Sequence, residues 1–136
     1  MDFVQFSLSG LDEFLLYAGL AIAFVYAFLF VYMKITPYNE LTLIKDGNIA
    51  AALSLSGALL GFTMPLAAAI FQSAHPIDMM LWALIAAIVQ LLVYVAVRYS
   101  LFNVSRRIPE GQVATGIVLG AVSFAAGILN AACMTY

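Results

Sequence analysis

Four long runs of apolar residues, each about as long as a membrane-crossing helix, dominate this sequence. A hydrocarbon core about 30 Å thick takes about 20 residues of a helix that rises about 1.5 Å per residue. The runs cover residues 11–33, 49–71, 79–97 and 113–136. The segments between them combine charge with proline or glycine, which is typical of helix ends. Continuous apolar runs, without the alternation of a barrel strand, predict one all-α membrane domain with four transmembrane helices.

Composition supports this interpretation and excludes several classes of protein. Of the 136 residues, 65% are hydrophobic and 9% are charged, whereas a soluble domain has about 45–50% and about 25%. A net charge of −2 does not suggest nucleic acid as a partner. The single Cys133 and the single His75 supply neither an internal disulfide nor a four-ligand metal site, and no cofactor is expected. The first ten residues contain no Lys or Arg, so we expect a retained first helix and no signal peptide.

The basic residues predict which loops face the cytoplasm. All five lie in the first and third loops, at Lys34, Lys45, Arg98, Arg106 and Arg107. By the positive-inside rule, loops 34–48 and 98–112 are cytoplasmic and both termini lie on the other side of the membrane. Aromatic residues agree with these boundaries, because amphipathic rings favour the interface. We expect Tyr32, Tyr38 and Tyr99 at the cytoplasmic interface, and Trp82 and Tyr136 at the outer one.

A short motif recurs at the start of the second and fourth apolar runs. Asp46-Gly47-Asn48 matches Glu110-Gly111-Gln112 at an offset of 64, since 110 − 46 = 64. The same offset pairs Lys34 with Arg98 and Asn39 with Asn103. The match predicts two tandem copies of a two-helix hairpin, at about residues 11–73 and 76–136. Two spans per copy preserve the orientation, so the repeat is parallel and not inverted.

The acid–Gly–amide motif has two interpretations. Acids and amides at helix starts commonly cap the exposed N–H groups and oppose the positive end of the helix dipole. Alternatively, the two motifs form a paired polar ring at the cytoplasmic mouth of a pore or a docking surface. Capping is the more frequent reason for these residues at this place, so we favour it.

Polar side chains inside the apolar runs need partners. Gln90 lies mid-way along the third run, with Tyr94 one helical turn later on the same face, and Asn130 lies in the outer part of the fourth. They are either hydrogen-bonded contacts between helices or the lining of a narrow hydrophilic path. We favour contacts between helices, because no ionisable group lies at that depth. Asp12 and Glu13 precede the uninterrupted apolar run, so we place them at the interface, unlike the buried acid of small four-helix exporters.

Small residues recur at helix-packing spacing in the second and fourth runs: Gly57, Gly61, Gly116, Gly120 and Gly127. A spacing of four places glycines on one face and lets two backbones approach closely. We therefore expect these two helices to form the packed centre, and the Phe- and Leu-rich first helix to face lipid. Pro65 should bend the second helix and free the carbonyl of Gly61. The glycine faces and midplane amides also led us to expect a homo-oligomer.

The strings GNIAAALSLSGALLGFTMPLA, from residue 47, and ATGIVLGAVSFAAGILNAACMTY, from residue 114, carry a family resemblance. They resemble the YjfL-type small inner-membrane proteins of bacteria, a family of unknown function. The resemblance covers about residues 47–136, and the ending from Gly127 to Cys133 is its most specific part. It implies a bacterial inner membrane and the repeated hairpin, and it lends no catalytic residues. In such a membrane, the orientation given by the basic loops places both termini in the periplasm. Members of the family look like companions of envelope-stress proteins of the phage-shock type.

Three classes of function follow from these observations. An intramembrane enzyme would need a nucleophile–base pair or a metal cluster, and the sequence offers neither. A small homo-oligomeric channel or transporter would use Gln90 and Asn130 to line its path. A membrane scaffold or accessory component, linked to envelope stress, would recruit a cytoplasmic protein partner through its basic loops. We favour the scaffold, because no selectivity signature is legible.

Overall fold

The computed structural model describes residues 3–100 and 104–134, and all of the regular structure in these ranges is helical. The helices are α1 (Phe3–Leu8), α2 (Leu11–Ile35), α3 (Glu40–Lys45), α4 (Ile49–Gln72), α5 (Pro76–Ser100), α6 (Val104–Arg107) and α7 (Val113–Cys133). Four stretches are long and apolar enough to cross a membrane: Phe3–Ile35, Ile49–Gln72, Pro76–Tyr99 and Val113–Cys133. The prediction of an all-α protein with four membrane-spanning helices is confirmed.

Two helix boundaries differ from the predicted ones for local reasons. α5 begins at Pro76 and not at residue 79, because proline suits the first helical position and the Nδ1 atom of His75 accepts a hydrogen bond from the Ile77 amide at 3.1 Å. α2 continues to Ile35, where Thr36 takes an extended conformation and ends the helix before Pro37. Asn103 and Tyr136, which the predictions also used, lie outside the described residues.

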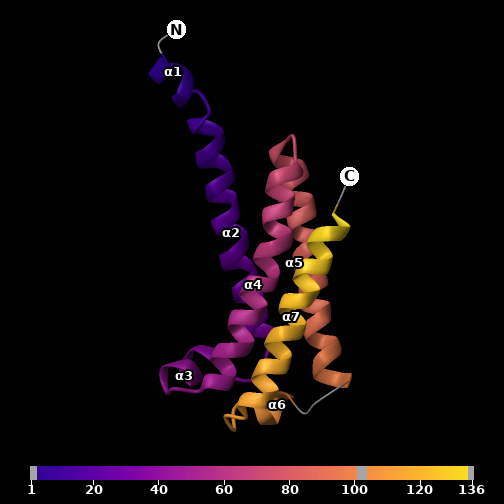
Figure 1. The fold of residues 1–136 in the computed structure, drawn as a ribbon. Coiled ribbons are helices and arrows are strands. Elements are labelled where there is room, and N and C mark those ends of the chain that lie inside the picture. The colour runs from indigo at the N-terminus through magenta and orange to yellow at the C-terminus, as the bar shows by residue number, and fades with distance from the viewer. Residues whose placement is uncertain (1–2, 101–103, 135–136) are drawn as a thin grey trace.

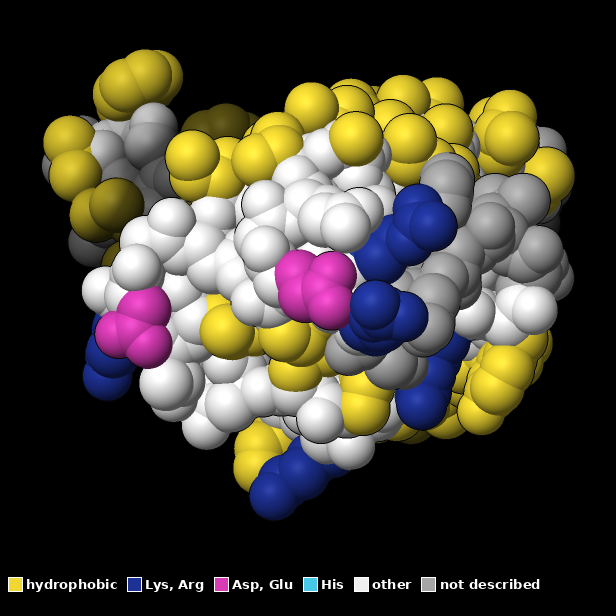
Figure 2. Space-filling model, turned by 90° about the horizontal axis from the view of Figure 1, so that it is seen from below, with side chains coloured by type: hydrophobic (Ala, Val, Ile, Leu, Met, Phe, Trp, Pro, Cys, Tyr) yellow, Lys and Arg dark blue, Asp and Glu magenta, His cyan; other side chains and the backbone are white. Residues whose placement is uncertain are grey.

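The four long helices run alternately down and up in Figure 1, so that α4 and α7 are parallel and both begin at the lower end. The short helices α3 and α6 lie at this lower end, beside the last turns of α2 and α5. We call it the basic end, because all five Lys and Arg residues belong to these segments. Seen from below, the basic end shows Lys and Arg side chains around its surface together with acidic ones (Figure 2).

The closest contact in the bundle joins α4 to α7. The backbones are so near that a Cβ atom added to Gly57 would overlap the backbone of Gly120, and one added to Gly116 would overlap that of Ala50. Helices in lipid associate through van der Waals contact, which requires small residues where the backbones meet. These are the two helices that the glycine spacing predicted at the centre.

Pro65 lies buried inside α4 and has no amide hydrogen for the carbonyl four residues earlier, that of Gly61. The oxygen of this carbonyl lies against Gly127 of α7, on the side where a Cβ would stand. A Cα–H group at this place is a weak hydrogen-bond donor. The missing side chain of Gly127 therefore lets α7 cover a carbonyl that proline leaves unpaired.

The two remaining long helices are not equivalent. α5 packs against both α4 and α7, whereas α2 makes its main contacts with α4 and α5 and diverges from the bundle towards the N-terminus (Figure 1). α2 buries only Phe28 and Tyr32. The Phe28 ring stacks on Phe62 of α4 at 4.4 Å, and the Tyr32 ring meets Tyr94 of α5 edge-on at 5.1 Å. α2 is therefore held near its last turns by aromatic contacts, and most of its length faces outwards.

Candidate functional site

The first acid–Gly–amide motif forms the turn between α3 and α4. The Asn48 amide donates to the Leu43 carbonyl at 2.9 Å, and the Gly47 amide donates to the Ile44 carbonyl at 3.0 Å. These two bonds define a Schellman motif, in which a glycine with positive φ ends a helix. Gly47 has a φ of +87°. Asp46 is accordingly the C-cap of α3, and not an N-cap of α4 as one form of the capping interpretation had it.

The second motif makes the same turn 64 residues later. The Gln112 amide donates to the Arg107 carbonyl at 3.1 Å, and the Gly111 amide donates to the Ile108 carbonyl at 2.9 Å. Gly111 has a φ of +78°. Each donor and acceptor is therefore the counterpart of one in the first turn, at the offset that the sequence motif shows.

The amide side chains of the two turns behave differently. Asn48 caps α4, because its Oδ1 atom accepts from the Ala51 amide at 2.9 Å. Its Nδ2 group donates to the carbonyl of Ile108 at 2.9 Å and thereby ties the first turn to the second. Gln112 makes no side-chain cap on α7. Capping by the motif is thus observed for Asn48 alone.

A hollow of about 440 Å³ lies between the two turns and opens outwards. Its lining comes from both motifs and their neighbours: Leu43, Asp46, Gly47, Asn48, Ile49, Pro109, Glu110, Gly111 and Val113. It combines carboxylate, amide and apolar groups, which is the mixed lining of a surface that meets a polypeptide. The two motifs thus share one polar concave surface.

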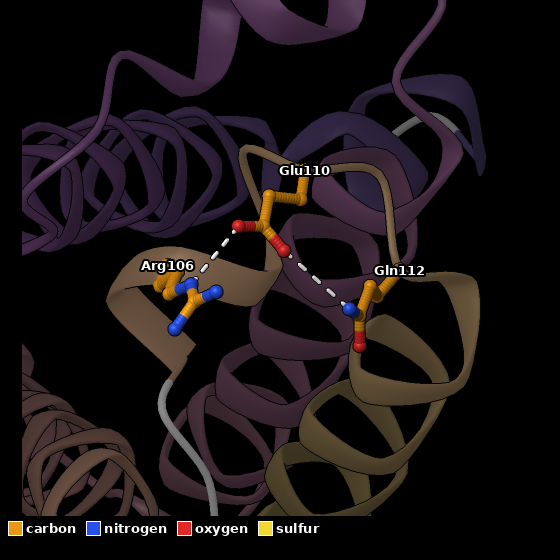
Figure 3. A network of polar contacts seen from close by, with 3 residues as sticks. All are labelled: Arg106, Glu110 and Gln112. Atoms are coloured by element: carbon orange, nitrogen blue, oxygen red, sulfur yellow. Dashed lines mark hydrogen bonds and ion pairs between the residues drawn. The ribbon is translucent and has the colours of Figure 1, made fainter.

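Several charged side chains of the basic end make contacts with neighbouring residues. The Arg106 Nε group pairs with Glu110 at 3.0 Å, and the Gln112 Nε2 group donates to the same carboxylate at 3.4 Å (Figure 3). Arg98 donates to the Ile35 carbonyl at 3.4 Å and so caps the end of α2. The Lys34 ammonium lies 5.3 Å from the centre of the Phe30 ring. Lys45 and Arg107 are exposed.

The polar residues predicted inside the membrane do not form one group. Gln90 is buried, and its Nε2 group donates to the Ser123 carbonyl of α7 at 3.1 Å, beside Gly61 of α4. Tyr94 instead faces Tyr32 of α2. Asn130 is seven residues beyond Ser123, about 10 Å along the helix axis. Gln90 therefore bridges two helices, and it shares no described hydrogen bond with Asn130.

A buried carboxyl group escaped the sequence analysis. Glu40, the first residue of α3, is 1% exposed, and Tyr32, Tyr38 and Tyr94 beside it are all buried. We call these four residues the Glu40 cluster. Both carboxyl oxygens and all three phenolic oxygens lack a hydrogen-bond partner among the described residues. The nearby Thr36 hydroxyl donates to the Met33 carbonyl at 3.1 Å.

Burial changes the acidity of the groups in this cluster that lie outside the spanning helices. Desolvation raises the pKa of Glu40 from 4.5 to about 7, although an interaction with the Thr36 hydroxyl opposes the rise. Desolvation also raises the pKa of Tyr38, and the nearby Tyr94 and Glu40 add to the effect. In both cases burial penalises the charged form of the group.

The cluster also shows what surrounds two of the tyrosines expected at the membrane interface. Tyr32 and Tyr38 are 1% and 9% exposed, so their rings lie inside the protein, and their depth in the membrane stays a prediction. They cover Glu40 and the end of α2, and the Tyr32 ring packs against α5. Tyr99, the third member of the expected set, is 77% exposed.

Comparison with known proteins agrees with this architecture. Residues 5–134 match the family described as Domain of Unknown Function (DUF350). The chain is also 43% identical over 129 residues to the UPF0719 inner membrane protein YjfL of Escherichia coli strain K12, which covers 95% of this chain and 98% of the relative. The same protein of Escherichia coli O157:H7 matches to the same extent. No solved structure matches.

The chain therefore belongs to the DUF350 family of multi-spanning membrane proteins, and the resemblance noted from the sequence is confirmed. Its relative is an inner membrane protein, which supports the same location for this chain. Neither description names an enzymatic activity.

Proposed function

We propose that this protein is a membrane scaffold or accessory component that presents its basic end to a cytoplasmic protein partner. The observation that carries the proposal is the mixed polar hollow between the two turns. By contrast, two hollows along the length of α2, away from the basic end, are lined almost wholly by apolar side chains. The polar groups that could bind a protein partner therefore lie at the basic end. The link to envelope stress stays a hypothesis that rests on the family resemblance.

The proposed orientation has the basic end in the cytoplasm and both termini in the periplasm. Its support is that all five basic residues belong to one end of the bundle, as the positive-inside rule requires. The exposed Cys133 near the other end provides a direct test. A membrane-impermeant maleimide should label Cys133 in intact spheroplasts, and it should label a cysteine at exposed Thr42 only after lysis.

We further propose that the chain consists of two tandem parallel hairpins. The turns at Gly47 and Gly111 share their φ sign and their hydrogen bonds at an offset of 64. The second helices of the two hairpins, α4 and α7, are parallel and pack against each other. The first helices, α2 and α5, have different neighbours, so a repeat would have diverged most at these positions.

A homo-oligomer remains part of the proposal as a prediction. The glycines that suggested it face each other within one chain, so they no longer point to a second copy. The large apolar side chains exposed along most of α2 match a helix that faces lipid, as expected from the sequence. Native mass spectrometry from nanodiscs should detect more than one copy, and a strictly monomeric species would contradict this part.

The channel or transporter is the second candidate. The buried Oε1 atom of Gln90 and the Nδ2 atom of Asn130 have no partner among the described residues, which favours a hydrated path. The Gln90–Ser123 hydrogen bond argues for a contact between helices instead. Catalysis is not proposed, because no metal-binding group of three His, Cys, Asp or Glu residues occurs within 3–100 and 104–134.

Site-specific photo-crosslinking in living cells tests the scaffold. A photoreactive residue at Leu41 or Val113, both exposed at the basic end, should capture one defined cytoplasmic protein. The same residue at Ile77, exposed at the opposite end, is the matched control and should not capture it. Ion flux through purified protein in liposomes, lost in both Gln90→Leu and Asn130→Leu, would replace the scaffold with the channel.

A further inference from the structure

Burial of the polar groups in the Glu40 cluster costs free energy, and the fold alone does not require these groups. A buried carboxylate without a partner is strongly unfavourable, and buried hydroxyls without partners add to the cost. Among Glu40 and the three tyrosines, five buried oxygens lack partners in the described part of the chain. Glu40 is the first residue of α3. The residue 64 positions later is Val104, which is the first residue of α6. The aligned position in the other half of the sequence therefore holds an apolar residue.

Among the residues that the structure describes, no cation is found to offset the charge of the Glu40 carboxylate. From α2, the Lys34 ammonium is placed over the Phe30 ring. From α5, Arg98 donates to the Ile35 carbonyl and lies 5.3 Å from the centre of the Tyr99 ring.

The other elements around the cluster supply hydroxyls and no charge. α4 contributes Ser54, whose hydroxyl donates to the Ala51 carbonyl at 3.2 Å, and the loop contributes Tyr38. On α3 itself, Lys45 and the C-cap Asp46 are exposed and lie at the far end of the helix. Within the described residues, the groups that face Glu40 are therefore hydroxyls.

Solvent reaches the edge of this cluster. A hollow of about 410 Å³ opens between the end of α2 and the start of α3, and Thr36, Tyr38 and Glu40 form part of its lining. The carboxyl oxygens themselves have almost no exposed surface. The hollow thus provides a route for a proton, and the cover over the oxygens leaves no room for a larger ligand.

We propose that the carboxyl group of Glu40 is a proton-binding site, and that its proton holds the end of α2 against α4 and α5. Proton uptake from solvent converts the carboxylate to a neutral acid, which stays buried among the three tyrosine hydroxyls. Proton release leaves a charge that must be hydrated. Water then enters at Tyr32, one of the two buried residues of α2, and loosens the attachment of this helix.

Two features support the coupling to α2. Burial raises the pKa of Glu40 to about 7, so the group changes charge in the neutral range. The Tyr32 ring belongs to the cluster and also makes the edge-on contact with Tyr94 that fixes α2 to α5. The remaining aromatic contact of α2 is the Phe28–Phe62 stack, one turn away. The inference is independent of the partner assigned to the basic end.

Infrared difference spectroscopy on the full chain in nanodiscs tests proton binding. Wild-type protein should show a protonated-carboxyl band that disappears with a midpoint near neutral pH. Glu40→Gln should lose this band, whereas Glu110→Gln, which removes an exposed acid at the same end, should keep it. Thr36→Val should move the midpoint to higher pH, because the interaction of the Thr36 hydroxyl with Glu40 favours the charged form of the carboxyl group. A band that persists in Glu40→Gln, or that is absent at mildly acid pH, would overturn the proposal.

Spin-label distances test the coupling. Ile22→Cys on α2 and Leu84→Cys on α5, both exposed positions, would be labelled in a Cys133→Ser background. The wild-type distance distribution should be narrow at mildly acid pH and should broaden to longer distances at mildly alkaline pH. Glu40→Gln should stay narrow throughout, because its amide carries no charge. A wild-type distribution that does not change with pH would refute the coupling of Glu40 to α2.

Discussion

The carbonyl oxygen of Gly61 lies directly against Gly127, at the place where any other residue would carry its Cβ atom. Pro65 frees this oxygen on α4, and a glycine on α7 covers it. The contact thus links a helix-breaking residue on one helix to a small residue on another, in the tightest part of the bundle.

Gly127→Ala should therefore destabilise the protein strongly. The new methyl group would overlap the Gly61 backbone, which cannot move aside as a flexible side chain would. Overpacking of this kind costs about 1–3 kcal/mol. The measurement is the free energy of unfolding in mixed micelles. Gly19→Ala on α2 is the matched control, because nothing lies within 4 Å of its added Cβ, and it should be neutral or slightly stabilising.

Gly47→Ala and Gly111→Ala should each cost about 1 kcal/mol for a different reason. Both added Cβ atoms have open space, but both residues have positive φ, which costs an ordinary residue about 1–2 kcal/mol. Gly47→Asn should be milder, since Asn tolerates this conformation better. Gly10→Ala, with open space and a φ of −90°, serves as the control. Equal losses for all of the alanine variants would contradict the role of φ.

Asn48→Ala should destabilise more than Gln112→Ala, although the two amides occupy matching places. Asn48 caps α4 and also bonds to the Ile108 carbonyl in the second turn, whereas Gln112 bonds only to Glu110, at 3.4 Å. Loss of a cap costs about 1 kcal/mol, and the bond between the turns adds to it. Thermal unfolding of both variants in the same detergent makes the comparison. Similar losses would show that the two turns are energetically equivalent.

The stability of the protein should fall as the pH rises through the titration of Glu40. Between 4.5 and about 7, the folded state holds a proton that the unfolded chain has released, so the free energy of unfolding decreases with pH and levels off above that window. The full difference corresponds to about 3 kcal/mol. Unfolding titrations across this window should show the slope in Glu110→Gln and a flatter curve in Glu40→Gln. A wild-type stability that rises over this window would contradict the assignment.

Gln90→Leu should change stability by only about 0.6 kcal/mol, the average for a hydrogen bond between membrane helices. It removes the bond to the Ser123 carbonyl, but it also removes an unpartnered Oε1 atom. Gln90→Glu should cost considerably more, because it places a carboxyl group in the same buried position. Unfolding in mixed micelles distinguishes the two, and a larger loss for Leu than for Glu would be contrary to this reasoning.

The spanning helices could be predicted because their signals are local. Twenty consecutive apolar residues specify a membrane helix by themselves, and glycines four residues apart specify a close-packed face. The turns were located correctly, but the glycines within them were not recognised as Schellman residues. An acid before a glycine and an amide after it had suggested a helix start, whereas Gly47 ends the preceding short helix.

Glu40 could not be predicted because its burial depends on residues far away in the sequence. Its neighbours Asn39 and Thr42 are polar and suggest an exposed loop, while Tyr94, which helps to cover it, lies 54 positions further on. For the same reason the burial of Tyr32 and Tyr38 was not predicted. The offset of 64 offered one signal, because it aligns the acidic Glu40 with the apolar Val104.

The pairing of α4 with α7 also sets an order of events during synthesis. α4 ends at Gln72, and its closest partner is the last helix of the chain. The contact of α2 with α5 also forms late, because Tyr94 must be made before the ring of Tyr32 has a neighbour on α5. Each early helix therefore enters the bilayer as a separate span, stable there because its backbone hydrogen bonds are internal. Assembly of the bundle is a late event that follows insertion.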